Sequence, residues 1–494
     1  MANAVLNLSE LNGSNGFVIN GIDIYDSSGS SVSSAGEING DGFDDLIIGA
    51  PLADPNGQSG AGESYVVFGS NSGFNAQLNL STLDGSNGFV INGIAESDIS
   101  GASVSSAGDI NGDGFDDLII GARNASPNGQ LNAGESYVVF GSNSGFDAQL
   151  NLSSLDGSNG FVINGIAQSD YSGGSVSSIG DINGDGFDDL IIGARNADPN
   201  GQSGAGSSYV VFGSNSGFDA QFNLSSLDGS NGFVINGINA FDNSGRSVSS
   251  AGDINGDGFD DLIIGAPNAD PNGQSGAGSS YVVFGSNSGF DAQINLSSLD
   301  GSNGFVVNGI AVYDNSGYSV SSAGDVNGDG FDDLIIGARY AYPNGQYNAG
   351  ESYVVFGSSS GFAANLNLSS LDGSDGFVIN GIAGDISGSS VSSAGDINGD
   401  GFDDLIIGAR NASPNGQFRA GTSYVVFGRS SSFGAEFNLS SLDGSDGFVI
   451  NGINASDSSG SSVSSAGDIN GDGFDDLIIG ATGADPNGQL WRRL

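Results

Sequence analysis

The chain has 494 residues, with 57 acidic and 9 basic side chains and a formal net charge of −48. Every basic residue is arginine, and cysteine and histidine are absent, which excludes disulfides, thiol nucleophiles, the usual zinc ligands and the commonest general base. This charge argues against nucleic acid and anionic membranes as partners, and no apolar run approaches the roughly 18 residues that a membrane-spanning helix needs.

The N-terminal segment 1–22 contains one predicted strand, Gly16–Ile22, of the kind that ends each later repeat. A long unit then recurs, and copies of its acidic loop begin at Glu37, Asp109, Asp181, Asp253, Asp325, Asp396 and Asp468. The spacing is constant, except that it is one position shorter between Asp325 and Asp396. A repeat of this length fixes the architecture of the whole chain and indicates one closed body rather than several domains. We therefore treat residues 1–494 as a single domain.

Each unit contains four short apolar segments separated by clusters of Gly, Asn, Asp and Ser. In one copy they are Ala102–Gly108, Leu118–Ala122, Ser136–Gly141 and Gly160–Ile166. β-branched and aromatic runs of this length are typical of strands, and no segment has helical periodicity. Four strands repeated seven times predict an all-β fold, a seven-bladed β-propeller of four-stranded blades. A β-solenoid is the rival, although its coils are usually much shorter than this unit.

The first two strands of each unit are joined by a nine-residue acidic loop, which reads Asp-Ile-Asn-Gly-Asp-Gly-Phe-Asp-Asp from Asp109. Side-chain oxygens at positions 1, 3, 5 and 9 and the carbonyl at position 7 are hard ligands of the kind that calcium selects. Gly at position 6 permits a sharp turn. We interpret Asp116, at position 8, as a turn or surface residue and not a ligand. The alternative is a set of metal-free hairpin turns, which Asn-Gly and Asp-Gly also suit.

We predict about one Ca²⁺ per blade. The predicted ligands are Glu37, Asn39, Asp41, Phe43, Asp45, Asp109, Asn111, Asp113, Phe115, Asp117, Asp181, Asn183, Asp185, Phe187, Asp189, Asp253, Asn255, Asp257, Phe259, Asp261, Asp325, Asn327, Asp329, Phe331, Asp333, Asp396, Asn398, Asp400, Phe402, Asp404, Asp468, Asn470, Asp472, Phe474 and Asp476. The first loop differs from the others because Glu37 replaces Asp, and its extra methylene either weakens the site or makes the carboxylate bidentate.

The string Gly-Asp-x-Asn-Gly-Asp-Gly-Phe-Asp-Asp-Leu-Ile-Ile-Gly-Ala-Pro, intact at Gly252–Pro267, resembles the FG-GAP repeat of the propeller in integrin α chains. The resemblance covers almost the whole chain. It implies seven blades, calcium in the loops between first and second strands, and ligand contacts on the opposite face. The near-identity of the copies is typical of a bacterial repeat protein.

The last unit departs from the pattern. Its first two strands are present, but Gln489–Leu494 replaces the Ala-Gly-Glu-Ser-Tyr-Val-Val-Phe-Gly that continues other copies. Gly16–Ile22 is expected to supply the fourth strand of this blade, which leaves it without a third strand. The alternative is that Leu490–Leu494 substitutes poorly for that strand.

The copies differ mainly in two connections, from fourth to first strand and from second to third strand. Up-and-down alternation of strands places both on the face opposite the predicted calcium. Exposed Tyr and Arg are enriched in binding hot spots. We hypothesise that this face binds a protein or glycan partner through Arg339, Tyr340, Tyr342, Tyr347, Phe418 and Arg419. The alternative is neutral drift in tolerant loops.

The sequence favours a calcium-binding, integrin-α-like adhesion or recognition module that is extracellular or at the cell surface, although Met1–Asn7 lacks signal-peptide character. We expect no enzymatic activity, because no pair of carboxylates breaks the sevenfold pattern. A surface scaffold without a specific ligand, or a propeller hydrolase or lyase, is the alternative.

Overall fold

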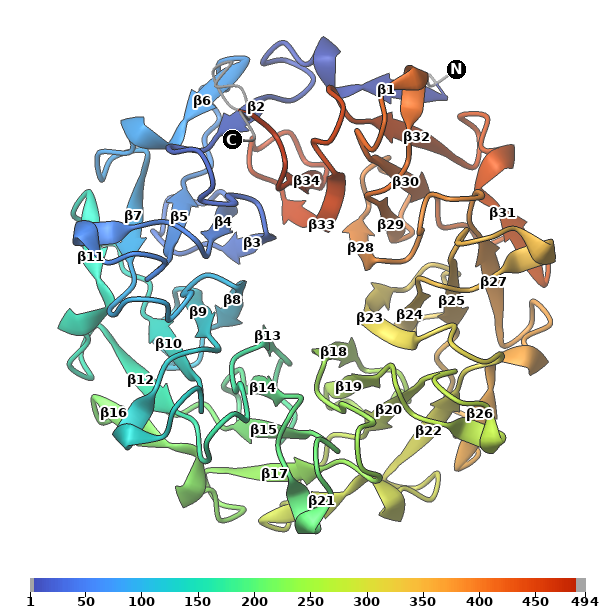
Figure 1. The fold of residues 1–494 in the computed structure, drawn as a ribbon, viewed down its shortest axis with the longest axis horizontal. Helices are drawn as coiled ribbons and strands as arrows, with labels where there is room; N and C mark the ends of the chain where they lie inside the picture. Colours follow the sequence, from blue (N-terminus) through green and yellow to red (C-terminus); the bar gives the residue numbers. More distant parts are fainter. Residues whose placement is uncertain (1–3, 486–494) are drawn as a thin grey trace.

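The computed structural model describes residues 4–485, and its sheets are arranged radially around a common centre (Figure 1). The protein is an all-β propeller, as the sequence predicts. Six five-stranded blades follow one another around the ring. Each blade runs from an innermost strand outward, and consecutive strands are antiparallel except for the outermost, which is parallel to its neighbour.

The blades use corresponding segments of each repeat. The first contains β3 (Ser31–Gly36), β4 (Asp45–Ala50), β5 (Glu63–Val67), β7 (Gly88–Asn92) and β11 (Gln149–Asn151). The second contains β8 (Ser103–Gly108), β9 (Asp117–Ala122), β10 (Glu135–Val139), β12 (Gly160–Asn164) and β16 (Gln221–Asn223). The third contains β13 (Ser175–Ser178), β14 (Leu190–Ala194), β15 (Ser207–Val211), β17 (Gly232–Asn236) and β21 (Gln293–Asn295).

The other three complete blades repeat this order. The fourth contains β18 (Ser247–Gly252), β19 (Asp261–Ala266), β20 (Ser279–Val283), β22 (Gly304–Asn308) and β26 (Asn365–Asn367). The fifth contains β23 (Ser316–Gly324), β24 (Asp333–Ala338), β25 (Glu351–Val355), β27 (Gly376–Asn380) and β31 (Glu436–Asn438). The sixth contains β28 (Ser390–Gly395), β29 (Asp404–Ala409), β30 (Thr422–Val426), β32 (Gly447–Asn451) and, from the other end of the chain, β1 (Val5–Asn7).

Short 3-10 turns complete each unit. One set follows the outermost strands: η1 (Leu8–Glu10), η3 (Leu80–Thr82), η5 (Leu152–Ser154), η7 (Leu224–Ser226), η9 (Leu296–Ser298), η11 (Leu368–Ser370) and η13 (Leu439–Ser441). The other set lies between second and third strands: η2 (Pro55–Gly57), η4 (Pro127–Gly129), η6 (Pro199–Gly201), η8 (Pro271–Gly273), η10 (Pro343–Gly345) and η12 (Pro414–Gly416).

The expectation of four strands per blade is wrong, because each complete blade gains a fifth from the next repeat. Gln221 and Asn223 of β16 pair in parallel with Val162 and Asn164 of β12. The Asn164 amide also donates to Asn223 across this pair. Strands as short as β16 do not stand out from the sequence as a strand pattern. The fifth strand ties each blade to the following repeat.

Two smaller sheets lie between the sixth and the first blade. One pairs β33 (Ser459–Gly467) with β34 (Asp476–Ala481), and the other pairs β2 (Val18–Asn20) with β6 (Gln77–Asn79). Within residues 4–485 no strand joins them. The predicted strand Gly16–Ile22 is therefore confirmed in a shorter form, whereas the pairing of Val5–Asn7 was not foreseen. The predicted substitute Leu490–Leu494 lies outside the described residues.

The core lies between neighbouring blades. Leu118, Ile119 and Ile120 of β9 are all fully buried. Leu118 and Ile120 pack with Ile47 of the first blade, while Ile119 packs with Leu190 of the third. A strand covered on both faces explains why this run of the sequence does not alternate between apolar and polar residues.

A ring of hydrogen bonds joins successive acidic loops. The backbone N–H of Asp109 donates to the Asp188 carboxylate of the next blade at 2.8 Å. The same bond links Asp116 to Glu37, Asp260 to Asp181, Asp332 to Asp253, Asp403 to Asp325, Asp475 to Asp396, and Asp44 to Asp468. The position-8 residue is therefore more than a turn residue. Gly108 has to be glycine, because a Cβ there would lie 2.2 Å from the Asp188 carboxylate.

We expect Asp188→Ala to lower the free energy of unfolding by about 1–2 kcal/mol, because it leaves the Asp109 N–H without its charged acceptor. Denaturant unfolding measures the change. Asp147→Ala is the matched control, because it removes the same charge from an exposed position in a neighbouring loop. An equal effect of both variants would show that the inter-blade bond contributes nothing.

Candidate calcium loops and the opposite face

The acidic loops are closed by bonds from their own backbone to their carboxylates. In the second copy, the Asp109 carboxylate accepts the N–H groups of Asp113 and Gly114, both at 3.0 Å. Asp113 accepts the N–H of Phe115 at 3.1 Å. Gly114 has a φ of +91°, so the sharp turn predicted at position 6 is confirmed. These bonds hold the carboxylates of positions 1 and 5 on the tip of one loop.

The side chain at loop position 9 lies deeper in the protein than those at positions 1 and 5. Asp117 is fully buried at the start of β9. One of its oxygens accepts the Gly141 N–H at 2.8 Å, and the Asn111 amide lies 3.1 Å from the other. Burial raises the pKa of Asp117 to about 8, and the neighbouring charges of Asp113 and Asp109 act in the same direction. The loop thus buries one carboxylate within the electrostatic influence of two others, and its nine residues include no cationic side chain.

The donor types in each loop are those that calcium accepts. Within residues 4–485, no three acidic side chains lie close enough together to hold an ion by themselves. The predicted set also includes the Asn111 amide and the Phe115 carbonyl. Amide nitrogen and oxygen are assigned from hydrogen bonds, and a half-turn of the Asn111 amide brings its oxygen toward Asp117. Two neutral oxygens and three carboxylates are a set that Ca²⁺ accepts.

The first loop is bonded differently from the others. Asp181, Asp253, Asp325, Asp396 and Asp468 each accept N–H groups from loop positions 4, 5 and 6. Glu37 accepts the N–H of Gly42 at 2.6 Å through its longer side chain. Aspartate at position 1 bonds to the loop backbone in every other copy, and glutamate makes a different set of these bonds in the first copy.

The two variable connections lie together, as predicted. The N–H of Tyr171, in a fourth-to-first connection, donates to Asn132 in the preceding second-to-third connection, and Ser172 donates to Ala133. The acidic loops instead bond to the connections that follow the third strands, as Gly141 does to Asp117. The variable connections and the acidic loops therefore occupy opposite faces of the ring.

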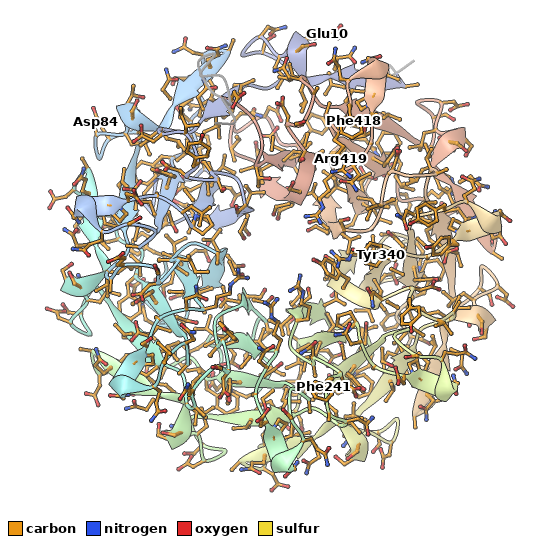
Figure 2. All side chains as sticks on the ribbon, viewed as in Figure 1. Glu10, Asp84, Phe241, Tyr340, Phe418 and Arg419 are labelled. Atoms are coloured by element: carbon orange, nitrogen blue, oxygen red, sulfur yellow. The ribbon has the colours of Figure 1, made fainter. Side chains whose placement is uncertain are left out.

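One position on the variable face combines backbone strain with exposed aromatic side chains. Tyr25, Phe241 and Tyr313 have φ values of +79°, +69° and +66°. The side chains of Phe241 and Tyr313 are 68% and 65% exposed, and Phe241 is labelled in Figure 2. A bulky residue in this left-handed region costs on the order of 1–2 kcal/mol. Serine or glycine occupies the same position in other copies, so the fold does not require an aromatic ring there.

Arginine and tyrosine form a cluster beside the innermost strands on this face. The Arg246 guanidinium donates to the Tyr318 hydroxyl and lies 4.6 Å from the centre of that ring. Arg339 lies 3.4 Å from the centre of the same ring and 4.4 Å from that of Tyr340, which Figure 2 places near the centre of the propeller. We call these four residues the arginine–tyrosine cluster.

Within the part of the chain that the structure describes, the arginines of this cluster have no acidic partner. Among the described residues, neither Arg246 nor Arg339 forms an ion pair with a carboxylate, and the buried Nε of Arg339 has no hydrogen-bond partner. Burial lowers the pKa of Arg339, and the nearby charges of Arg246 and Arg410 lower it further. Burial and the charge of Arg246 likewise lower the pKa of Arg123. Several cations thus converge on one part of a strongly acidic protein.

The predicted partner residues form three local pairs. Arg339 stacks on Tyr340, Tyr342 and Tyr347 meet edge to face at 5.4 Å, and Arg419 lies 5.2 Å from the Phe418 ring. Figure 2 places Phe418 and Arg419 away from Tyr340 around the ring. Tyr318 was missed, although Arg246 occupies the same position one repeat earlier, and a comparison of copies at that position would have found it.

The model of the FG-GAP repeat matches residues 28–67, 100–139, 172–211, 244–283, 316–355, 387–426 and 459–491. Phosphatidylinositol-glycan-specific phospholipase D of Bos taurus is 32% identical over 34% of this chain and 18% of its own length. Integrin alpha pat-2 of Caenorhabditis elegans is 29% identical over 47% of this chain and 17% of its own. Integrin alpha-5 of Xenopus laevis is 30% identical over 37% of this chain and 17% of its own.

These relatives correct one expectation. The chain spans less than a fifth of each of these three proteins, and one of them bears the name of an enzyme. Repeats of this kind therefore occur in enzymes as well as in integrins, and the symmetry of the repeats is no ground for excluding enzymatic activity. Within residues 4–485 no helix is long and apolar enough to cross a membrane. The seven matched repeats cover more than half of the sequence, and the chain belongs to the FG-GAP repeat family.

Proposed function

We propose that this protein is a calcium-stabilised recognition propeller that acts outside the cell or at its surface. Within residues 4–485, the β33–β34 and β2–β6 sheets are the inner and outer parts of a seventh blade. The similarity to integrin α chains supports an adhesion role. The observation that carries the proposal is the arginine–tyrosine cluster, because it concentrates unpaired positive charge on the face opposite the acidic loops.

Calcium is the proposed structural ion. In the second copy, Asp109, Asn111, Asp113 and Asp117 would hold it through side-chain oxygens and Phe115 through its carbonyl. Three carboxylates in one loop repel one another, and a bound cation relieves this repulsion. The corresponding residues of the other loops would do the same, with Glu37 in place of aspartate in the first.

The proposed ligand presents a small number of acidic groups. Arginine presents its donors in a planar fork that matches a carboxylate, and the Tyr318 and Tyr340 rings hold the Arg339 guanidinium in place. A polyanion is unsuitable, since a net charge of −48 repels it over the rest of the surface. The ligand class is therefore a glycan that ends in an acidic sugar, or a protein with an isolated acidic side chain at its contact surface.

We expect Arg339→Ala to weaken binding of such a ligand by roughly tenfold or more, as the loss of a charged hydrogen bond predicts. The measurement is binding of the wild-type protein and the variant to arrayed glycans with sialic or uronic acid ends and to their neutral counterparts, in millimolar calcium. Arg429→Ala is the matched control, because Arg429 bonds to Val326 in the connection on the acidic-loop face.

Three results would contradict the proposal. The wild type could bind acidic glycans no better than neutral ones, both variants could lose binding equally, or the wild type could fail to bind any of the glycans. The last would favour a scaffold without a specific ligand. A calcium-dependent thermal melt of each variant separates loss of the ligand site from loss of the fold.

A further inference from the structure

Two connections of each repeat unit meet at one fixed place on the variable face. We number the units by their acidic loops, from the first at Glu37 to the seventh at Asp468. In the third unit, the N–H of Phe241 in the fourth-to-first connection donates to the carbonyl of Ser203 in the second-to-third connection at 2.9 Å. We call these two residues a contact pair. The same bond forms the pairs Ser59 and Ser97, Leu131 and Ser169, Ser275 and Tyr313, Tyr347 and Gly384, and Phe418 and Ser456.

In units two to six, every contact pair combines one large apolar side chain with serine or glycine. Two different connections supply the large side chain, the second-to-third in units two, five and six and the fourth-to-first in units three and four. All five are between 57% and 69% exposed. Unrelated changes in two tolerant loops do not explain one large side chain in each of five consecutive pairs. We call this set the apolar arc; it consists of Leu131, Phe241, Tyr313, Tyr347 and Phe418.

The fold itself does not require the apolar arc. The first unit forms the same bond between Ser59 and Ser97, with no large side chain. The loops instead make room for the large ones, because a Cβ on Gly276 would lie 3.1 Å from the Tyr313 ring. Where the second-to-third connection supplies the large side chain, asparagine or arginine replaces that glycine. Steric matching explains why one member of a pair is small, but not why the other is large and exposed.

Polar groups that can bond to hydroxyls lie beside each member of the arc. An exposed glutamine directly precedes the second-to-third residue of every pair, such as Gln202 before Ser203. Beside Phe241, the Asn268 amide donates to Asn243 at 2.6 Å. Figure 2 places Phe241 and Phe418 on separate blades. The apolar side chains are therefore distributed among amides, unlike the contiguous apolar core of a protein–protein interface.

This combination of groups suits a sugar. A sugar ring has an apolar face of C–H groups and a rim of hydroxyls, so it fits an exposed aromatic ring flanked by amides. Tyrosine and phenylalanine provide such surface with little conformational entropy to lose. The net charge of −48 disfavours a polyanion. The arc therefore fits neutral sugars, and its extension over five consecutive units fits a polymer of them.

We propose that the apolar arc binds a neutral polysaccharide, with one sugar ring packed against each of its aromatic side chains and hydroxyls bonded to the neighbouring amides. Each contact is weak by itself, and simultaneous contacts along one polymer provide the affinity. Short neutral glycans therefore bind far more weakly than the polymer. The arc goes beyond the proposed function, because it uses none of the four residues of the arginine–tyrosine cluster.

The experiment is affinity electrophoresis of the full chain in native gels with millimolar calcium. Separate gels contain laminarin, hydroxyethylcellulose, dextran or galactomannan, all neutral polymers. The high charge of the protein gives it mobility, so binding to a neutral polymer appears as retardation. We expect at least one polymer to retard the wild type in a saturable manner. Oligosaccharides of about four sugars from that polymer should compete roughly tenfold more weakly or worse at equal mass concentration.

Variants of one contact pair test the place of the ring. Phe241→Ser should weaken binding by about threefold or more, since one of several contacts is lost. Leu52→Ser is the matched control and should bind as the wild type does, because Leu52 is an exposed apolar residue of the same face outside the arc. Addition of Ser203→Phe to Phe241→Ser supplies the ring from the other connection and should restore binding. A ring needed only for local packing would not be restored in this way.

Phe241→Gly separates binding from stability. Glycine adopts the φ of +69° at this position without strain, so this variant should melt at a higher temperature than the wild type. Its binding should nevertheless weaken as in Phe241→Ser. Arg339→Ala should bind the neutral polymers as the wild type does, so that failure of the arc and failure of the acidic-ligand site are distinguished.

Three results would overturn the proposal. They are the absence of retardation of the wild type by all four polymers, equal retardation of Phe241→Ser and the wild type, and binding by the double variant that is no stronger than that of Phe241→Ser. The first result would leave the arc as a contact surface for a protein.

Discussion

Removal of calcium is expected to lower the melting temperature of this protein by about 15 °C or more. Each site that is saturated at a hundredfold excess over its dissociation constant contributes about 2.7 kcal/mol of stability by mass action. In a chain of this length, each kcal/mol of stability changes the melting temperature by roughly 1–2 °C. Several such sites in one cooperative ring therefore account for the expected change in melting temperature. Thermal melts followed by circular dichroism, in chelator and in millimolar calcium, measure it.

Magnesium is the matched control for the melt. Mg²⁺ requires near-ideal octahedral geometry and gives up its water reluctantly, so it should restore little of the lost stability. A melting temperature that is the same in chelator and in calcium would mean that the acidic loops are turns held by their own hydrogen bonds. Equal stabilisation by both ions would indicate screening of a highly charged surface instead of specific sites.

Phe161→Ala is expected to lower the free energy of unfolding by about 3–5 kcal/mol. Its ring is fully buried, stacks on Phe218 at 4.3 Å and lies 6.0 Å from Phe140. The substitution removes these contacts and leaves a cavity between two blades that cannot collapse freely. Denaturant unfolding in calcium measures the change.

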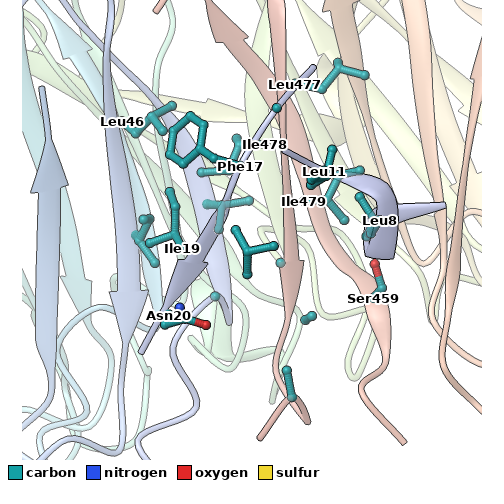
Figure 3. Close-up of a pocket in the computed structure, with 18 of the residues that line it drawn as sticks. Leu8, Leu11, Phe17, Ile19, Asn20, Leu46, Ser459, Leu477, Ile478 and Ile479 are labelled. Carbon is teal, nitrogen blue, oxygen red and sulfur yellow. The ribbon is translucent and has the colours of Figure 1, made fainter. Parts of the chain in front are cut away.

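Phe17→Ala is the matched control at the same repeat position, directly before β2 (Figure 3). Phe17 stacks on Phe74 but has no third ring among the described residues, and it is half-buried. We expect a loss of about 1–2 kcal/mol, since less apolar surface returns to water. Equal losses for the two variants would contradict the weaker packing around Phe17.

The repeated strands were predictable because their own side chains have the pattern of a β-strand. β9 and β10 are β-branched and aromatic runs bounded by turn residues, and both lie close to the predicted bounds. The predicted turn at Gly114 is likewise a local property. The fifth strands, such as β16, depend on an edge supplied by the preceding repeat, so their own short sequences give no local indication of them.

Long-range contacts also explain what was missed in the loops. Asp116 was interpreted from its own loop alone, yet its acceptor role depends on Glu37 in the preceding blade. The arginine–tyrosine cluster joins Arg246 of one repeat to Tyr318 and Arg339 of the next, and only the ring geometry brings them together. Strand alternation placed most of these residues on the correct face, but it carries no information on which of them touch.

Calorimetric titration of the calcium-free protein with Ca²⁺ is the most direct test of a propeller held by metal in its repeated loops. We expect saturable binding with six or seven sites per chain. A stoichiometry near six would mean that Glu37 weakens the first site, and one near seven would mean that it does not. Absence of saturable binding would contradict the assignment of calcium to these loops and would leave the ring held by packing and by its inter-blade hydrogen bonds.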